Sequence, residues 1–108
     1  MDQRESLRTS GTLMILSLIN ERDMYGYEII ETLKKTSNDV FNLKEGTLYP
    51  ILHRLEQQGL LKSYQKTVEN KKRKYYKITK KGVTQLAEEK ESWKIYSNAI
   101  SNVVGFAS

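Results

Sequence analysis

The 108-residue sequence has no cysteine, one proline and one histidine. Without cysteine the chain has neither a disulfide framework nor a thiolate that could act as nucleophile or metal ligand. No apolar run approaches the roughly 18–20 residues that span a bilayer, so we expect no transmembrane segment. The first residues, Met-Asp-Gln-Arg-Glu-Ser, are too polar to open a secretory signal. We therefore expect a cytoplasmic protein that does not bind membranes.

Catalytic and metal-binding constellations are also scarce. His53 is the only imidazole, no glycine-rich phosphate loop occurs, and the carboxylates follow no metal-ligand spacing. Glu88, Glu89 and Glu91 form a solvated helix face. We therefore expect a protein that is not an enzyme, with no catalytic residue, no metal site and no cofactor.

Positive charge, in contrast, is abundant and concentrated in one segment. Residues 62–81 hold nine Lys or Arg and one acidic residue, a balance of +8 in a protein whose total is +5. The segment alternates and is rich in tyrosine, which predicts strands at Leu61–Val68 and Lys72–Ile78 joined around Asn70 and Lys71. A strand edge protected from aggregation needs fewer cations than this. The segment therefore indicates binding to a polyanion.

The spacing of apolar residues predicts the other elements. We expect helices at Ser6–Asn20, Gly26–Lys35, Thr47–Gln58 and Lys80–Val104, and a short strand at Val40–Leu43. The order helix, helix, strand, helix, strand, strand, helix describes a mainly α domain with a β-hairpin, an α+β fold. The first helix is apolar nearly all round, which indicates burial on several sides and favours a second chain as one of the covering surfaces.

The third helix has two distinct faces. On a helical wheel one narrow arc is apolar and must face the core; it contains Leu48, Ile51, Leu52 and Leu55. The opposite arc carries groups that can donate to base edges and phosphates: Tyr49, Pro50, His53, Arg54 and Gln57. Many exposed helix faces have such a composition, so it is the neighbouring basic hairpin that favours DNA as the partner.

The last helix carries more apolar residues than so small a domain can cover. Leu86, Trp93 and Ile100 recur every seven residues, as in the seam of a helix that packs on another helix. Together with the first helix, this predicts a two-fold homodimer. We divide the chain into a DNA-binding unit, residues 1–79, and a C-terminal dimerisation helix, residues 80–108, that packs with the first helix of the partner. The expected interface residues are Leu7, Met14, Leu86, Trp93, Tyr96, Ile100 and Val103.

Three ordered motifs resemble the PadR-type transcriptional regulators. They are Met-Tyr-Gly-Tyr-Glu-Ile-Ile at 24–30, Glu-Gly-Thr-Leu-Tyr-Pro at 45–50 and Arg-Lys-Tyr-Tyr-Lys-Ile-Thr-Lys at 73–80. The similarity spans about residues 11–93, and the single C-terminal helix is similar to the small subfamily. This resemblance implies a winged helix-turn-helix fold, a homodimer and repression at a palindromic operator in double-stranded DNA.

The resemblance also implies roles for individual residues. In that family the Gly-Thr-Leu-Tyr-Pro helix enters the major groove, which implies DNA contacts by Thr47, Tyr49, His53 and Arg54. The basic wing touches phosphate, which implies contacts by Lys72, Arg73 and Lys74. Many members have Gly-Gly at the wing turn, where this chain has Glu-Asn-Lys at 69–71.

Trp93 has two possible roles. A multidrug-sensing PadR-like repressor has a Glu-Ser-Trp stretch similar to residues 91–93, which implies that Trp93 of each subunit sandwiches a planar aromatic molecule at the dimer centre. The simpler interpretation is that Trp93 anchors the dimer, because tryptophan is enriched in interface cores.

A winged-helix module for protein assembly is the main alternative function. Its wing would meet an acidic protein surface and its last helix a different chain. A steep loss of affinity with salt and a preference for one palindromic sequence distinguish a DNA reader from such a module.

Overall fold

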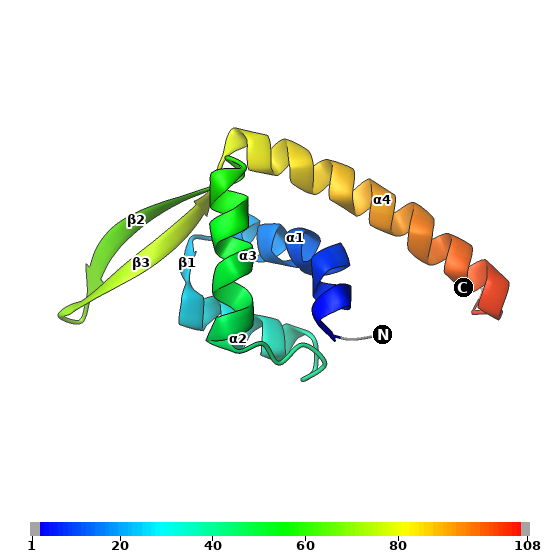
Figure 1. The fold of residues 1–108 in the computed structure, drawn as a ribbon, viewed down its shortest axis with the longest axis horizontal. Helices are drawn as coiled ribbons and strands as arrows, with labels where there is room; N and C mark the ends of the chain where they lie inside the picture. Colours follow the sequence, from blue (N-terminus) through cyan, green and yellow to red (C-terminus); the bar gives the residue numbers. More distant parts are fainter. Residues whose placement is uncertain (1–2, 107–108) are drawn as a thin grey trace.

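The computed structural model describes residues 3–106, with side chains from residue 10 onward. Within this range the chain forms an α+β winged-helix domain (Figure 1), which confirms the predicted fold class. The elements in chain order are α1 (Gln3–Glu21), β1 (Met24–Tyr25), α2 (Gly26–Thr36), α3 (Glu45–Gln57), β2 (Leu61–Val68), β3 (Lys71–Ile78) and α4 (Lys80–Val104).

The sheet is antiparallel, with the strand order β1-β3-β2. Strands β2 and β3 pair over their whole length, from Leu61 opposite Ile78 to Val68 opposite Lys71, and form the wing. The connecting residues, Glu69 and Asn70, have φ angles of 52° and 65°. Two consecutive positive φ angles are what a type I′ hairpin turn requires. The turn therefore lies one residue earlier than predicted.

The predicted strand at Val40–Leu43 is wrong, because these residues form the loop before α3. Val40 is 67% exposed, and the backbone N–H of Phe41 donates to the Ser37 hydroxyl at 2.9 Å. The third strand is instead β1, whose Met24 and Tyr25 pair with Tyr76 and Tyr75. A two-residue strand is too short to show an alternating pattern.

Helix α1 lies at the centre of the domain. Ile15, Leu16 and Ile19 are at most 1% exposed, and Met14 is half-buried against the same core. Segments of the same chain, namely α2, α3, α4 and β3, contact α1. Much of the apolar character of the described part of α1 is therefore explained by its own chain, and a second chain on this helix stays a prediction.

Helix α3 has the predicted two faces. Leu48, Leu52 and Leu55 are 0% exposed and belong to the core, with Ile51 half-buried beside them. The helix begins two residues earlier than predicted, so Pro50 lies in its second turn rather than its first. The core thus fixes α3 along one side and leaves the opposite side on the surface.

A close joint connects the end of α3 with the start of α4. The Thr79 hydroxyl donates to the carbonyl oxygens of Gly59 and Leu60, and it accepts the backbone N–H of Gly82 at 3.0 Å as the helix cap. A Cβ on Gly82 would overlap the Leu60 carbonyl. From this joint α4 runs along α1 and then extends beyond the core, where none of the other helices or strands in residues 3–106 accompanies it (Figure 1).

Candidate DNA-binding surface

The exposed stripe of α3 is formed by Tyr49, His53 and Gln57, which are four residues apart and therefore share one side of the helix. Tyr49 is 45% exposed, although its phenol rests on the start of α2. A Cβ built on Gly26 would lie 2.5 Å from the Tyr49 hydroxyl oxygen. The ring thus contacts α2 at one edge and is exposed to solvent at the other.

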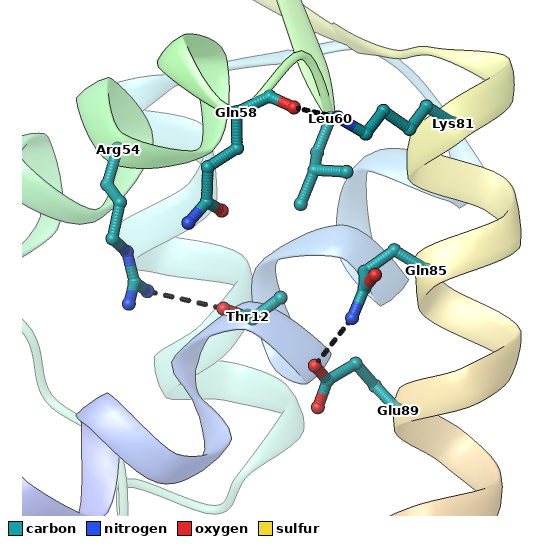
Figure 2. A pocket seen from close by; sticks show the side chains of 7 residues that line it. All are labelled: Thr12, Arg54, Gln58, Leu60, Lys81, Gln85 and Glu89. Carbon is teal, nitrogen blue, oxygen red and sulfur yellow. Dashed lines mark hydrogen bonds between the residues drawn. The ribbon is translucent and has the colours of Figure 1, made fainter.

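Thr47 and Arg54 lie on a different flank of α3. They are seven residues apart, on the same side of the helix, and both are half-buried. Arg54 points toward α1, where its Nη2 donates to the Thr12 hydroxyl at 3.2 Å (Figure 2). The structure therefore does not place the four predicted residues of α3 on one exposed face.

A polar hollow of about 430 Å³ lies on this flank between α1, α3 and α4 (Figure 2). Its polar groups bond largely to one another: Lys81 donates to the Gln58 carbonyl at 2.9 Å, and Gln85 donates to Glu89 at 3.0 Å. The lining residues are Thr12, Arg54, Gln58, Leu60, Lys81, Gln85 and Glu89. The bonds of Arg54 to Thr12 and of Lys81 to Gln58 connect α3 and its C-terminal end to α1 and α4, whereas the bond of Gln85 lies within α4.

The wing has two faces because alternate residues of a strand point to opposite sides. The inner face is defined as the side that carries the buried Leu61 and Tyr76. The outer face is the side that carries Tyr64 and Tyr75. By this alternation Lys72 and Lys74 belong to the inner face. Burial raises the pKa of Tyr76, against the lowering effect of Lys74, so its phenol stays protonated at neutral pH.

Glu56 joins the inner face to α3. Its carboxylate accepts the Ser63 hydroxyl of β2 and lies 3.8 Å from the Lys74 Nζ of β3. Glu56 thus ties Lys74 of the inner face to α3, one residue before Gln57 of the exposed stripe. Glu56 was not predictable as a site residue, since nothing in a linear pattern distinguishes it from any other polar residue on this helix.

Arg73 does not share the face of its two neighbours. It lies on the outer face, half-buried, with its guanidinium carbon 4.3 Å from the centroid of the Tyr25 ring. The prediction that Lys72, Arg73 and Lys74 act as one group is therefore corrected by strand alternation: two of them border α3 and one points away.

Comparisons with known proteins agree with this geometry. The sequence profile of the transcriptional regulator PadR-like family matches residues 15–88, which is more than half of the chain. The chain belongs to this family. A transcriptional regulator of Mycobacterium tuberculosis is 34% identical to this PadR-like protein over 89 residues, which cover 82% of this chain and 80% of that one.

Solved structures give the same result. A transcriptional regulator from Clostridium thermocellum superimposes on this PadR-like protein with a TM-score of 0.83 and 36% identity, over 91% of this chain and 96% of that one. A PadR-like transcriptional regulator from Bacillus cereus has a TM-score of 0.82 and 35% identity, over 93% and 96%. The family and its structures are transcriptional regulators, so this PadR-like protein is a DNA-binding regulator and not an enzyme.

Helix α4 of this PadR-like protein presents a long apolar stripe to solvent. Trp93, Tyr96, Ile100 and Val103 are 45%, 54%, 44% and 87% exposed. Leu86 belongs to the core of its own chain at 3% exposure, so its assignment to the dimer interface is wrong. The side chain of the predicted interface residue Leu7 lies outside the described residues.

Trp93 lines a hollow of about 410 Å³ between α1 and α4, together with Leu13, Glu89, Ser92 and Tyr96. The Trp93 and Tyr96 ring centroids are 5.9 Å apart. In this PadR-like protein the hollow is open to solvent and mainly apolar in its lining.

Among residues 3–106, no helix is both long and apolar enough to cross a membrane.

Proposed function

We propose that the protein is a cytoplasmic repressor that binds a palindromic operator as a homodimer, with α3 of each protomer in the major groove. One observation supports this proposal most strongly: the exposed stripe of α3 and the inner wing cations meet at Glu56, 3.8 Å from Lys74. A helix for the groove beside cations for the phosphates is the arrangement that a winged helix needs to bind a duplex.

The surface divides into base-reading and phosphate-binding parts. In the proposed complex Tyr49 and His53, from the exposed stripe, contact base edges, while Lys72 and Lys74 contact phosphates. Thr47 and Arg54, on the flank of α3, contact the phosphates that line the groove. Arg54 has five N–H donors, of which the Thr12 hydroxyl engages one, so the others remain available for phosphate.

The dimer is proposed to form through residues 80–108, with residues 1–79 of each protomer binding DNA. Its support is the exposed stripe of α4, since contiguous apolar surface on this scale marks an interaction site. Two-fold pairing sets the half-sites about one helical turn, roughly 34–36 Å, apart.

A small molecule that releases the operator is a second proposal, carried by the hollow at Trp93. A two-fold pairing of α4 would bring two such hollows together, so that both Trp93 rings could stack on one planar aromatic molecule. Glu89 in the lining favours a cationic compound. We therefore expect a planar cationic dye to quench the fluorescence of this single tryptophan. Absence of quenching in an intact dimer would leave Trp93 as an interface anchor only.

The decisive experiment is the selection of bound sequences from a random duplex library with the purified protein. We expect enrichment of one palindrome that binds at least about 10³-fold more tightly than random duplex. Affinity for it should fall with salt at a log–log slope near −0.9 per neutralised phosphate. A library that emerges without sequence preference would favour the protein-assembly module instead.

A further inference from the structure

Most of the cations of the wing lie on the side that α3 does not share. Strands β2 and β3 carry seven Lys or Arg, and alternation places only Lys72 and Lys74 on the inner face. The other five lie on the outer face: Lys62, Lys66, Lys71, Arg73 and Lys77. The proposed contact with the operator therefore uses the minority of the wing's charge.

The outer cations also face one another directly. In the register of the two strands Lys62 is opposite Lys77, and Lys66 is opposite Arg73. Like charges in directly opposed positions destabilise a strand pair. The inner cations have neutral partners, since Lys74 is opposite Gln65 and Lys72 is opposite Thr67. Repulsion is thus confined to the outer face, where a bound polyanion would relieve it.

Tyrosine rings hold two of these cations in position. Arg73 lies over Tyr25, and the Lys66 Nζ is 5.3 Å from the centroid of the Tyr75 ring. Tyr75 in turn packs against Tyr25 and Tyr64, with centroids 5.4 and 5.8 Å apart. Of these three rings, Tyr25 and Tyr75 are engaged with each other and with cations, and Tyr64, at 38% exposure, stacks one face on Tyr75. The face therefore offers ordered charge with little free ring surface on which bases could stack.

Two carboxylates border the outer face, and both have partners. Asp23 accepts the Tyr64 hydroxyl at 2.6 Å, and Glu28 accepts Arg22 at 2.8 Å. Lys62 and Lys77, in contrast, are exposed, and no described carboxylate forms an ion pair with them. The net potential of this face is therefore strongly positive.

We propose that the outer face binds the phosphate backbone of a second DNA duplex, so that one dimer on its operator captures another DNA segment. The outer face lies on the opposite side of the sheet from α3 and the inner cations, which the first duplex occupies. A duplex backbone fits a face with five cations and little free ring surface better than single-stranded bases do. This inference rests on the proposed function for the first duplex and adds a second, sequence-independent contact.

Two matched variants test it by removing one charge pair from each face. The outer variant is Lys62→Gln with Lys77→Gln, which leaves the cations over the tyrosines in place. The inner variant is Lys72→Gln with Lys74→Gln. Each is measured for binding to a single duplex of the selected operator, and for capture of a labelled random-sequence duplex on beads whose operator sites are saturated with protein.

We expect wild-type protein to capture the labelled duplex in a salt-sensitive manner. The outer variant should bind the operator within about threefold of wild type and lose at least about fivefold of the capture, because it retains the inner cations but has fewer charges for the second backbone. The inner variant should lose operator affinity.

Other outcomes overturn the proposal in distinguishable ways. Operator binding without capture by wild type would refute the second contact and leave the proposed function intact. If the outer variant still captured the second duplex, the two duplexes would be bridged by the α3 surfaces of the two protomers and not by the outer face. If both variants lost operator affinity equally, the outer face would bind the first duplex. If the outer face bound polyglutamate but not the labelled duplex, the partner of this face would be an acidic polypeptide. Failure to select any operator would refute both proposals.

Discussion

The phenol of Tyr49 occupies the space that a side chain at Gly26 would need, with its hydroxyl oxygen 2.5 Å from where a Cβ would lie. The φ angle of Gly26 is not among the positive ones, so its backbone conformation is open to any residue. The glycine is thus favoured by the close approach of Tyr49 from α3 and not by a turn. This contact joins the start of α2 to the exposed stripe of α3.

Gly26→Ala should therefore separate DNA recognition from stability. The new methyl group displaces a ring tip that can move, and alanine is favoured by up to about 1 kcal/mol over glycine in a helix, so the free energy of unfolding should change little. Preference for the operator over random duplex should fall about tenfold, as fluorescence anisotropy with both duplexes would measure. In a Tyr49→Ala background the same change should have no further effect; an additional loss there would contradict the coupling.

Gly82→Ala should act in the opposite way, on stability. Here the Cβ meets the backbone carbonyl of Leu60 and the Ile78 side chain, and a backbone atom at the joint cannot move aside. Overpacking of this kind costs about 1–3 kcal/mol or more. Gly46→Ala is the matched control, because nothing lies within 4 Å of its Cβ position, and should stabilise the protein by up to about 1 kcal/mol. Urea unfolding of both variants decides; equal midpoints would contradict the role of the joint.

The fold was predictable where a pattern extends over many residues. The apolar arc of α3, the long α4 with its Thr79 cap and the strand pair of the wing all follow from periodicity or from a capping residue. The two-residue β1 was not predictable, because its only support is the pairing with β3. Likewise, the apolar surface of α1 does not reveal whether its own chain or another chain covers it.

The candidate site was predictable by residue type but not by orientation. Tyr49 and His53 are exposed on α3 as expected. Arg54 instead donates a hydrogen bond to Thr12, 42 positions away, and Arg73 lies over the Tyr25 ring. Nothing in the sequence pattern predicts either contact. Strand alternation alone would have separated Arg73 from Lys72 and Lys74, since adjacent residues of a strand cannot share a face.

The hydrogen bond between Tyr64 and Asp23 should make stability depend on alkaline pH. The bond raises the pKa of Tyr64 from its ordinary value of 10.0 to about 12, because only the protonated phenol donates to the carboxylate. Because this pKa is higher in the folded than in the unfolded chain, the bond stabilises the fold fully below pH 10. This stabilisation is lost as the pH rises toward 12. The difference in unfolding free energy between wild type and Tyr64→Phe should therefore be constant near neutrality and shrink over that window.

The exposed Tyr27 provides a control for the loss of a phenol hydroxyl as such. Tyr27→Phe removes a phenol that is 57% exposed and has no such bond, so it should leave the unfolding free energy close to that of wild type near neutral pH. Urea unfolding at a series of pH values gives both differences. If the Tyr64→Phe difference stayed constant up to pH 12, the bond to Asp23 would not contribute to the stability of the fold.

Two isoleucines on α4 test the proposed dimer with the same substitution. Ile100 is seven residues from Trp93 and on its side of the helix, whereas Ile95 lies on the opposite side, and both are well exposed at 44% and 62%. Ile100→Glu removes two buried isoleucines from a two-fold interface, each worth about 1.5–3 kcal/mol, and puts a charge in their place. The dimer dissociation constant should rise at least about 100-fold, since every 1.4 kcal/mol is tenfold. Ile95→Glu should leave it within about threefold, as sedimentation equilibrium would measure. If both variants dissociated equally, or the wild type sedimented as a monomer, the stripe with Trp93 and Ile100 would not be the dimer interface. The proposal that a two-fold dimer binds a palindromic operator would then lose its structural support.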